Sequence, residues 1–230
     1  MIIEKGQQST LQIRTIFKIT GIIGSLWALL VVFSATLVYL PAHPDFSFFT
    51  TYLSDIGDTP VWSQIFFNAG TLLSVPIRFL IIILFVLRLE QLGVGKIFTI
   101  VTVFLGLVTS AGTVLMTAVP YSLAPSVHKS GIPLYFLGVV FMQALVGARE
   151  WSLKGVSKIL PGLSFLQVIL YLVFAGLMLL YEQGSVDRNT PVVWEWLCFA
   201  TSIFWLLGHS LILGNPINQR QGDERMLSNT

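Results

Sequence analysis

The chain has 230 residues, of which 54% are hydrophobic and only 10% are charged, and its mean hydropathy is +0.81. A soluble domain carries about 25% charged residues, so this composition excludes an ordinary soluble fold. The formal net charge of +2 decides little about partners, while the single cysteine, Cys198, excludes an intrachain disulfide and a cysteine-based metal site.

Six apolar segments follow one another along the chain, and each is long enough to cross a bilayer core of about 30 Å, which takes about 20 helical residues. The first is too long for the apolar region of a signal peptide, so we expect it to be retained. We predict an all-α, polytopic membrane protein: a six-helix transmembrane bundle over residues 19–213, between tails at 1–18 and 214–230. The predicted helices span residues 19–41, 61–87, 97–119, 131–148, 160–181 and 193–213.

Basic residues alternate between the gaps that separate these segments. Ten of the 13 Lys and Arg residues lie in the two tails and in alternate gaps, whereas the remaining gaps carry only Lys129 and Arg188. The positive-inside rule therefore predicts that both termini are cytoplasmic. Arg78 lies inside the second segment, where we expect it to snorkel toward the cytoplasm or to hold a lipid phosphate. His209, near the inner end of the last segment, is expected to be a packed or interfacial histidine.

Small residues four positions apart indicate where helices approach each other closely. Gly21 and Ser25 have this spacing in the first segment, as do Gly106 and Ser110 in the third. In lipid, such pairs let helix backbones come into close contact.

The longest connection, residues 41–62, lies on the predicted non-cytoplasmic side and contains acidic residues without any Lys or Arg. It is half apolar, so we expect it to lie on the membrane surface or to fold over the mouth of the bundle. Thr59 or Asp58 is predicted to cap the second helix, with Pro60 at its first position and Gly57 in a turn. Capping of that helix does not explain Asp55, which lies further upstream.

Three more polar residues are predicted on the same side: His128, just before the fourth segment, Glu182, after the fifth, and Glu195, at the start of the last. A carboxylate at the edge of the hydrocarbon usually faces the bundle interior or a wet cavity. If Asp55, His128 and Glu195 converge, they form an acid/base pocket or a head-group site; alternatively, they form a hydrogen-bonded network that holds the loop on the helix ends. The chain has no metal-binding, nucleotide-binding or nucleophile motif, so we expect no metal and no cofactor.

Three stretches resemble the Frag/DRAM/Sfk family: YLSDIGDTP with VWSQIFFNAG, then VHKSGIPLYFLGVVFMQAL, then VVWEWLCFATSIFWLLGHSLI. The resemblance covers all six segments in order. Asp58 departs from the family pattern, which often has Thr or Ser there, and Trp62 stands where a Glu is frequent. The positions that match the family motifs are Ser54, Asp55, Gly57, Pro60, His128, Glu195 and Trp196.

The resemblance implies handling of membrane lipids from the non-cytoplasmic side, since the family includes autophagy modulators, proteins of GPI-lipid remodelling and proteins that assist phosphoinositide synthesis. Our leading hypothesis is a non-catalytic protein that binds a lipid head group with acidic residues gathered without a cation. Its predicted site residues are Ser54, Asp55, Gly57, Asp58, His128, Glu195 and Trp196.

Two other hypotheses remain. One is an enzyme that exchanges acyl chains on GPI-like lipids, with His128 as general base and Asp55 or Glu195 orienting it. The other is a scaffold that recruits a cytoplasmic or membrane protein partner through its basic loops and residues 215–230. Membrane lipids, and not nucleic acid, are the expected partners. The same pattern fits the plasma membrane, an endomembrane such as the Golgi or the lysosome, and a bacterial inner membrane.

Overall fold

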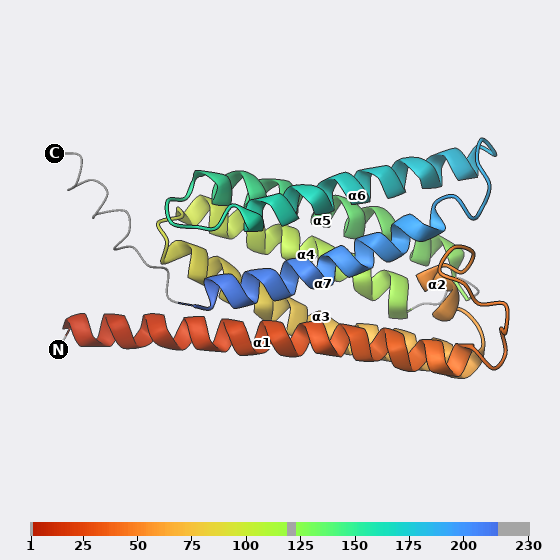
Figure 1. Cartoon of the computed structure of the whole chain (residues 1–230), viewed down its shortest axis with the longest axis horizontal. Coiled ribbons are helices and arrows are strands. Elements are labelled where there is room, and N and C mark those ends of the chain that lie inside the picture. Colours follow the sequence, from red (N-terminus) through yellow and green to blue (C-terminus); the bar gives the residue numbers. More distant parts are fainter. Residues whose placement is uncertain (1, 119–122, 216–230) are drawn as a thin grey trace.

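The computed structural model describes residues 2–118 and 123–215, and the regular structure of these residues is helical throughout (Figure 1). Six helices are long, and one, which follows the first, has only four residues. In chain order the helices are α1 (Ile2–Tyr39), α2 (Leu53–Ile56), α3 (Val61–Glu90), α4 (Lys96–Ala118), α5 (Pro125–Ser152), α6 (Ile159–Glu182) and α7 (Val192–Leu213).

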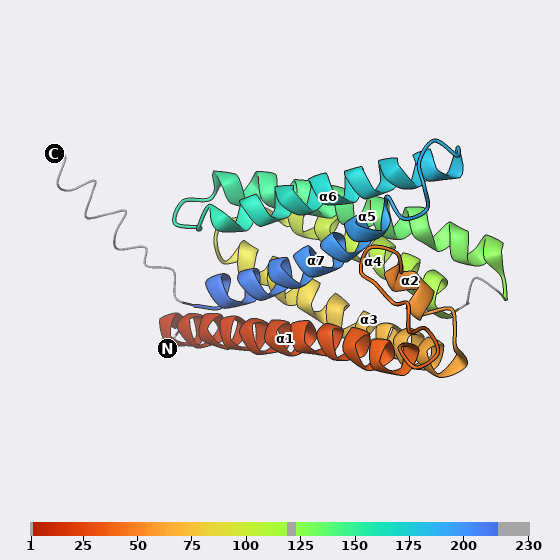
Figure 2. The same cartoon turned by 45° about the vertical axis from the view of Figure 1, so that its right-hand side comes forward.

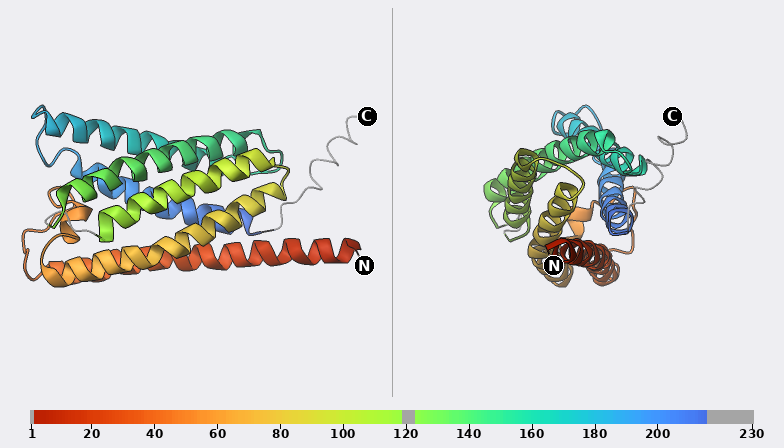
Figure 3. Two further views of the ribbon diagram at one scale, coloured as in Figure 1. Left: turned by 180° about the vertical axis from the view of Figure 1, so that it is seen from behind. Right: turned by 90° about the vertical axis from the view of Figure 1, so that its left-hand side faces the viewer.

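The six long helices form a closed ring in chain order. Each packs against the next long helix, and α7 packs against α1 to close the ring (Figure 3). The short helix α2 lies at one end of the ring, where it contacts α1, α3 and α7 (Figure 2). We call this the α2 end. We call the opposite end, where α1 begins and α7 finishes, the terminal end.

The predicted fold class is confirmed. Every long helix overlaps one predicted apolar segment, and all six are long and apolar enough to cross a membrane. Two helices begin well before the predicted segments: α1 continues back to Ile2 and α5 begins at Pro125. Hydropathy locates an apolar stretch, whereas a helix continues through polar residues at the membrane boundary, and Pro125 suits a first turn because it lacks an amide hydrogen. Most of the predicted C-terminal tail, residues 216–230, lies outside the described residues.

The outer surface of the ring is apolar, as a lipid-facing surface must be. Large hydrophobic side chains are exposed along each long helix. In water these side chains would form an extensive exposed apolar patch. Within a bilayer these side chains contact lipid tails instead. Examples from five helices are Phe33, Leu73, Phe104, Leu172 and Phe204.

Buried side chains fill the interior of the ring. The largest hydrophobic cluster lies toward the terminal end and includes Phe17, Phe85, Val146 and Trp205, from four different helices. Two smaller clusters lie toward the α2 end, and Ile56 of α2 is fully buried in one of them. The ring is therefore closed from both ends, by α2 at one and by large side chains at the other.

The predicted small-residue contacts are present. A Cβ atom on Gly21 would overlap Ser210 of α7, and one on Gly106 would lie 2.9 Å from Cδ1 of Ile82 on α3. Real Cβ atoms do not approach other heavy atoms this closely. These two glycines thus set how closely α1 approaches α7 and α4 approaches α3.

Arg78 does not snorkel toward the terminal end, so that prediction is wrong. Its Nη1 donates to Oγ1 of Thr113 on α4 at 2.9 Å, and its Nη2 donates to Oγ of Ser74 at 3.3 Å. Both acceptors lie nearer to the α2 end than Arg78 does, because side chains on a helix point toward its N-terminus. The guanidinium consequently joins α3 to α4.

Candidate functional site

The short helix α2 turns the loop between α1 and α3 back onto the bundle. Its N-cap is Tyr52, whose backbone is extended, and Asp55 is its third residue. Oδ2 of Asp55 accepts a hydrogen bond from the Tyr52 amide at 2.9 Å, which is half of a capping box. Capping of α2 thus explains Asp55. This differs from our prediction, which considered only capping of the long helix α3.

The start of α3 also differs from the prediction. Pro60 is the N-cap and not the first helical residue, and no side-chain oxygen caps the helix, so the predicted cap by Thr59 or Asp58 is wrong. The loop is instead fixed by α3 itself: Nδ2 of Asn68 donates to the carbonyl of Gly57 at 2.9 Å. A Cβ on Gly57 would lie 2.6 Å from Cδ1 of Phe67, so this close approach requires glycine.

The first turn of α7 holds the other side of α2. Oε2 of Glu195 accepts a hydrogen bond from the amide of Leu53 at 2.5 Å, which satisfies the first free N–H group of α2. Nε1 of Trp196 donates to the carbonyl of Thr51 at 2.9 Å. Both side chains are therefore engaged with the loop backbone.

Arg188, from the connection between α6 and α7, completes the attachment. Its Nη2 lies 2.7 and 2.6 Å from the two carboxylate oxygens of Asp55, and its Nη1 donates to the carbonyl of Thr50 at 3.0 Å. The guanidinium carbon lies 4.8 Å from the centre of the Tyr52 ring, and the Tyr52 hydroxyl donates to the Arg188 carbonyl at 2.8 Å. Residues more than a hundred positions apart thus form one junction.

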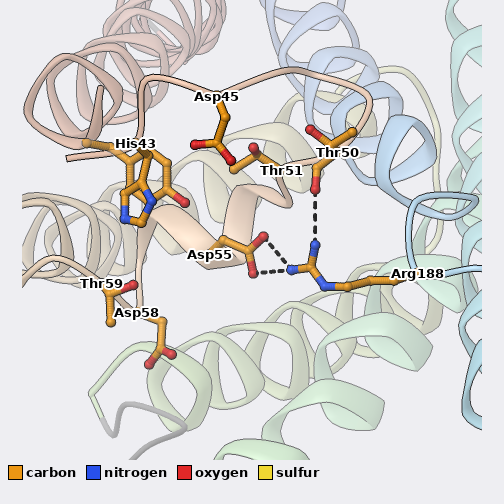
Figure 4. Close-up of a pocket in the computed structure, with 9 residues that line it drawn as sticks. His43, Asp45, Thr50, Thr51, Asp55, Asp58, Thr59 and Arg188 are labelled. Carbon is orange, nitrogen blue, oxygen red and sulfur yellow. Dashed lines mark hydrogen bonds and ion pairs between the residues drawn. The ribbon is translucent and has the colours of Figure 1, made fainter. Parts of the chain in front are cut away.

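A pocket of about 310 Å³ opens beside this junction (Figure 4). Its wall contains three carboxylates, from Asp45, Asp55 and Asp58, and one guanidinium, from Arg188. Because Arg188 pairs with Asp55, the other two carboxylates leave the pocket with a net negative charge. The other lining residues are Tyr39, His43, Thr50, Thr51 and Thr59.

Several pocket groups remain available to a ligand. Oδ1 of Asp58 is shielded from water and has no hydrogen-bond partner among the described residues. The His43 ring stacks on Tyr39, with ring centres 4.1 Å apart, which leaves its nitrogens at the edge of the stack. Across the part of the chain that the structure describes, no three His, Cys, Asp or Glu side chains are grouped as a metal site would require. The pocket therefore presents carboxylate oxygens, which accept hydrogen bonds, and hydroxyl groups, which can donate or accept them.

The environment shifts the pKa of two groups in the loops. The hydrogen bond that Arg188 donates to Asp55 raises the pKa of the Arg188 guanidinium above its ordinary value, so the guanidinium keeps its positive charge. Burial raises the pKa of the Tyr52 hydroxyl to about 12, although the nearby Arg188 opposes the shift. Tyr52 accordingly remains a neutral hydrogen-bond donor under physiological conditions.

The predicted site residues separate into two groups. Asp55 and Asp58 line the pocket, whereas Ser54, Gly57, His128, Glu195 and Trp196 are not among its lining residues. His128 lies in the first turns of α5 and not before the helix as predicted. The expectation of acidic residues without a cation is also wrong, because Arg188 pairs with Asp55.

Arg188 was not predicted as a site residue, and the positions of His43 and Asp45 in the pocket wall were not predicted either. A signal for Arg188 was present: it is one of two cations in the gaps of that side, and an anionic Asp55 needs a partner. For His43 and Asp45 the signal was weaker, since only their place in the acidic loop marked them.

The fold and the pocket define a multi-pass integral membrane protein with a polar site at one end of a helical ring. The family model described as Frag1/DRAM/Sfk1/Cwh43P N-terminal domain matches residues 15–208, which is most of the chain. The chain belongs to this family, and the resemblance found in its motifs is confirmed. No curated protein and no solved structure matches it.

Proposed function

We propose that this protein acts in membrane-lipid organisation or remodelling by binding a lipid head group in the pocket at the α2 end. The observation that carries the proposal is the grouping of Asp45, Asp55 and Asp58 around one pocket at the end of a membrane bundle. Carboxylates accept hydrogen bonds and do not donate them when ionised, so the pocket suits a head group that carries amine or hydroxyl groups.

Asp45 and Asp58 are the groups proposed to contact the ligand. Asp55 is already engaged, since its oxygens accept from Arg188 and from the Tyr52 amide. Asp58 has an oxygen without a partner among the described residues, and Asp45 lies across the pocket from it (Figure 4). The roles of Asp55, Glu195 and Trp196 in this proposal are to hold the loop that carries the two ligand-binding carboxylates.

The distribution of charge supports a site on the non-cytoplasmic side. Seven cationic side chains of the described residues belong to the terminal end, and the positive-inside rule assigns such an end to the cytoplasm. The α2 end then faces the lumen or the exterior. The seven are Arg14, Lys18, Arg88, Lys96, Arg149, Lys154 and Lys158.

Native mass spectrometry of the lipids that the purified protein retains tests the proposal. The wild type is compared with the Asp45→Asn, Asp58→Asn double variant, and with Asp187→Asn, which removes an exposed carboxylate at the same end but outside the pocket. We expect the wild type and Asp187→Asn to retain one class of amine- or hydroxyl-bearing lipid, and the double variant to retain at least about tenfold less, because hydrogen bonds to charged groups contribute about 1.5–3 kcal/mol each. Identical lipids in all three proteins would contradict the proposal.

A second candidate is an enzyme that exchanges acyl chains on GPI-like lipids. The observation that favours it is His43, which shares the pocket with the three carboxylates and could serve as the general base that we had assigned to His128. Purified protein should then transfer a labelled acyl chain, and His43→Ala should abolish transfer while His128→Ala should not. Retention of lipid without any acyl transfer would leave lipid binding as the function. Loss of function on deletion of residues 216–230 alone would favour the third hypothesis, a scaffold that recruits a protein partner.

A further inference from the structure

Arg78 places a positive charge inside the membrane-spanning part of the bundle. It lies in the middle third of α3 and is only partly exposed. A guanidinium stays charged in proteins, and a charge at this depth is costly unless it has a partner. In the part of the chain that the structure describes, the salt bridges join Asp55 to Arg188 and Glu150 to His209, and none reaches Arg78. No carboxylate of the described chain therefore balances this charge.

The hydrogen bonds of Arg78 leave several of its donors unused. A guanidinium has five N–H groups. Nη1 donates to Oγ1 of Thr113 and Nη2 to Oγ of Ser74, while Nε has no acceptor among the described residues. The two hydroxyls that accept these bonds give their own hydrogens to the carbonyls of Thr109 and Thr71, respectively. The groups still available at Arg78 are consequently N–H donors that carry a positive charge.

Helix α4 contributes one more unused donor, the hydroxyl of Ser110. α4 runs back along α3, and a Cβ on Gly106 would lie 2.9 Å from Cδ1 of Ile82 (Figure 3). Arg78 and Ser110 each lie one helical turn from this contact, both toward the α2 end, so they occupy matching positions on the two helices. Ser110 is 7% exposed, and its Oγ has no hydrogen-bond partner in the described chain. A buried hydroxyl of this kind is normally paired with protein, water or a ligand.

The unused groups between α3 and α4 complement an anion that has several acceptor oxygens. The fork of a guanidinium binds phosphate or carboxylate through two parallel N–H···O bonds. Ser110 can supply a further donor from the facing helix. Ser74 and Thr113 hold the guanidinium in place before any ligand arrives, which lowers the entropy lost on binding. A neutral ligand would leave the positive charge unbalanced.

The position of these groups relative to the end of α4 indicates a lipid as the source of the anion. Thr113 is little more than one helical turn from Ala118, the last residue of α4, or about 8 Å along the helix axis. Thr117 lies between them and is 8% exposed, so polar side chains continue from Arg78 toward the α2 end. Bilayers thin locally around an embedded arginine. A lipid phosphate of the leaflet at the α2 end can therefore reach the guanidinium.

We propose that Arg78 and Ser110 form a second lipid site, which binds the phosphate group of a phospholipid between α3 and α4. The site is separate from the head-group pocket, because neither residue lines that pocket. Its charge is also opposite, since the pocket presents carboxylates and this site presents a guanidinium. The two sites bind different chemical groups, and either proposal can fail without the other.

Titration of the delipidated protein in detergent, followed by native mass spectrometry, tests the proposal. The probes are phosphatidic acid, diacylglycerol with the same acyl chains, and inorganic phosphate. We expect the wild type to bind phosphatidic acid at least about tenfold more tightly than Arg78→Gln does, because the hydrogen bonds that are lost involve charged groups. Diacylglycerol, which lacks the phosphate, should bind both proteins equally. Inorganic phosphate at millimolar concentration should not displace phosphatidic acid; displacement would overturn the lipid as the source and assign the site to free phosphate.

Arg149→Gln is the matched control, since Arg149 is also partly exposed and donates to a neutral oxygen, the carbonyl of Gly93. It removes the same charge outside the site and should change the affinity for phosphatidic acid by less than about twofold. Ser110→Ala removes one hydroxyl and no charge, so it keeps the test decisive if Arg78→Gln does not fold. It should weaken the binding of phosphatidic acid at least about threefold and leave that of diacylglycerol unchanged.

The Asp45→Asn, Asp58→Asn double variant separates the two lipid proposals. It should bind phosphatidic acid at least as tightly as the wild type does, although it loses the lipid of the head-group pocket. Equal affinity of the wild type, Arg78→Gln and Ser110→Ala for phosphatidic acid would overturn the phosphate site and leave the proposal for the pocket intact.

Discussion

Both ends of this bundle pair a carboxylate with a basic side chain, but under opposite conditions. At the α2 end the side chains of Arg188 and Asp55 are 45% and 31% exposed, whereas at the terminal end those of His209 and Glu150 are fully buried. Exposed pairs contribute about 0–1 kcal/mol to stability, while loss of one partner of a buried pair costs about 3–5 kcal/mol. Similar chemistry thus positions a loop at one end and holds helices together at the other.

The comparison also separates the roles of the two pairs. At the α2 end Asp45 is exposed and Asp55 is partly exposed, so these carboxylates can exchange water for a ligand at little cost. At the terminal end the Glu150 and His209 side chains are 0% exposed, so no ligand from the solvent reaches them. Four substitutions or titrations test this contrast.

The largest effect is expected from Glu150→Ala, which leaves Nε2 of His209 buried beside a cavity. We expect the free energy of unfolding to fall by about 3–5 kcal/mol. Dodecyl sulfate unfolding measures it, with Glu90→Ala as the control that should change stability by less than about 0.5 kcal/mol. A loss below about 1 kcal/mol for Glu150→Ala would show that the buried pair contributes no more than an exposed one.

A smaller loss of stability is expected from Glu195→Ala, because Glu195 lies at the α2 end but within the first turn of the membrane-spanning helix α7. The substitution leaves the amide of Leu53 without its acceptor, which costs about 1–3 kcal/mol and affects α2 more than the bundle. Hydrogen exchange of the peptide that contains α2 should accelerate, while exchange in α4 and α5 should not. Glu195→Gln, which keeps an acceptor oxygen, should restore most of the protection; equal acceleration in both variants would contradict this role.

Asp55→Asn should have less effect on the whole protein, below about 1 kcal/mol. It weakens the contact with Arg188 but keeps an oxygen that can accept from the Tyr52 amide. We expect faster proteolytic cleavage of the variant in residues 40–60. High salt should accelerate cleavage of the wild type similarly, because salt screens exposed ion pairs. Arg188→Gln should give the same rate, and additive effects of the two substitutions would argue against a direct pair.

The smallest effect concerns the titration of Tyr52. Its pKa in the folded protein is about 12, above the ordinary value of 10.0, so the hydroxyl keeps its proton longer when folded than when unfolded. The stability that this group contributes is fully present below about pH 10 and is lost as the pH rises through about 12. Phenolate absorbance of the wild type minus that of Tyr52→Phe should show one group titrating near the upper value, and a midpoint near 10 would contradict it.

The fold could be predicted because a membrane-spanning helix is marked by features of a short, continuous stretch of sequence. Twenty apolar residues and the side on which Arg and Lys lie are readable without knowledge of any contact. The ring order of the helices could not be predicted in this way. It depends on which face of each helix carries small residues, and only Gly21 and Gly106 were identified as contact points.

The site could be predicted only in part, since its partners are distant in the chain. Asp55 and Asp58 were found from a contiguous motif, but Arg188 lies 133 positions from Asp55 and nothing local connects them. Asp55 was misjudged because a four-residue helix leaves no periodic pattern. His209 was interpreted as packed or interfacial, and its partner Glu150, 59 positions away, carried no signal in a stretch that also contains Arg149 and Lys154.

The polar contacts that cross the ring converge on α7, which follows the other described helices in the chain. Glu195 holds α2, His209 meets α5, and the carbonyl of Leu213 accepts from Arg88 of α3. Until α7 leaves the ribosome, the nascent chain is an open arc of five spanning helices with a gap between α6 and α1. In that interval Glu150 lacks its partner His209. The insertion of α7, and not that of the earlier helices, is therefore the step at which these contacts across the ring can form.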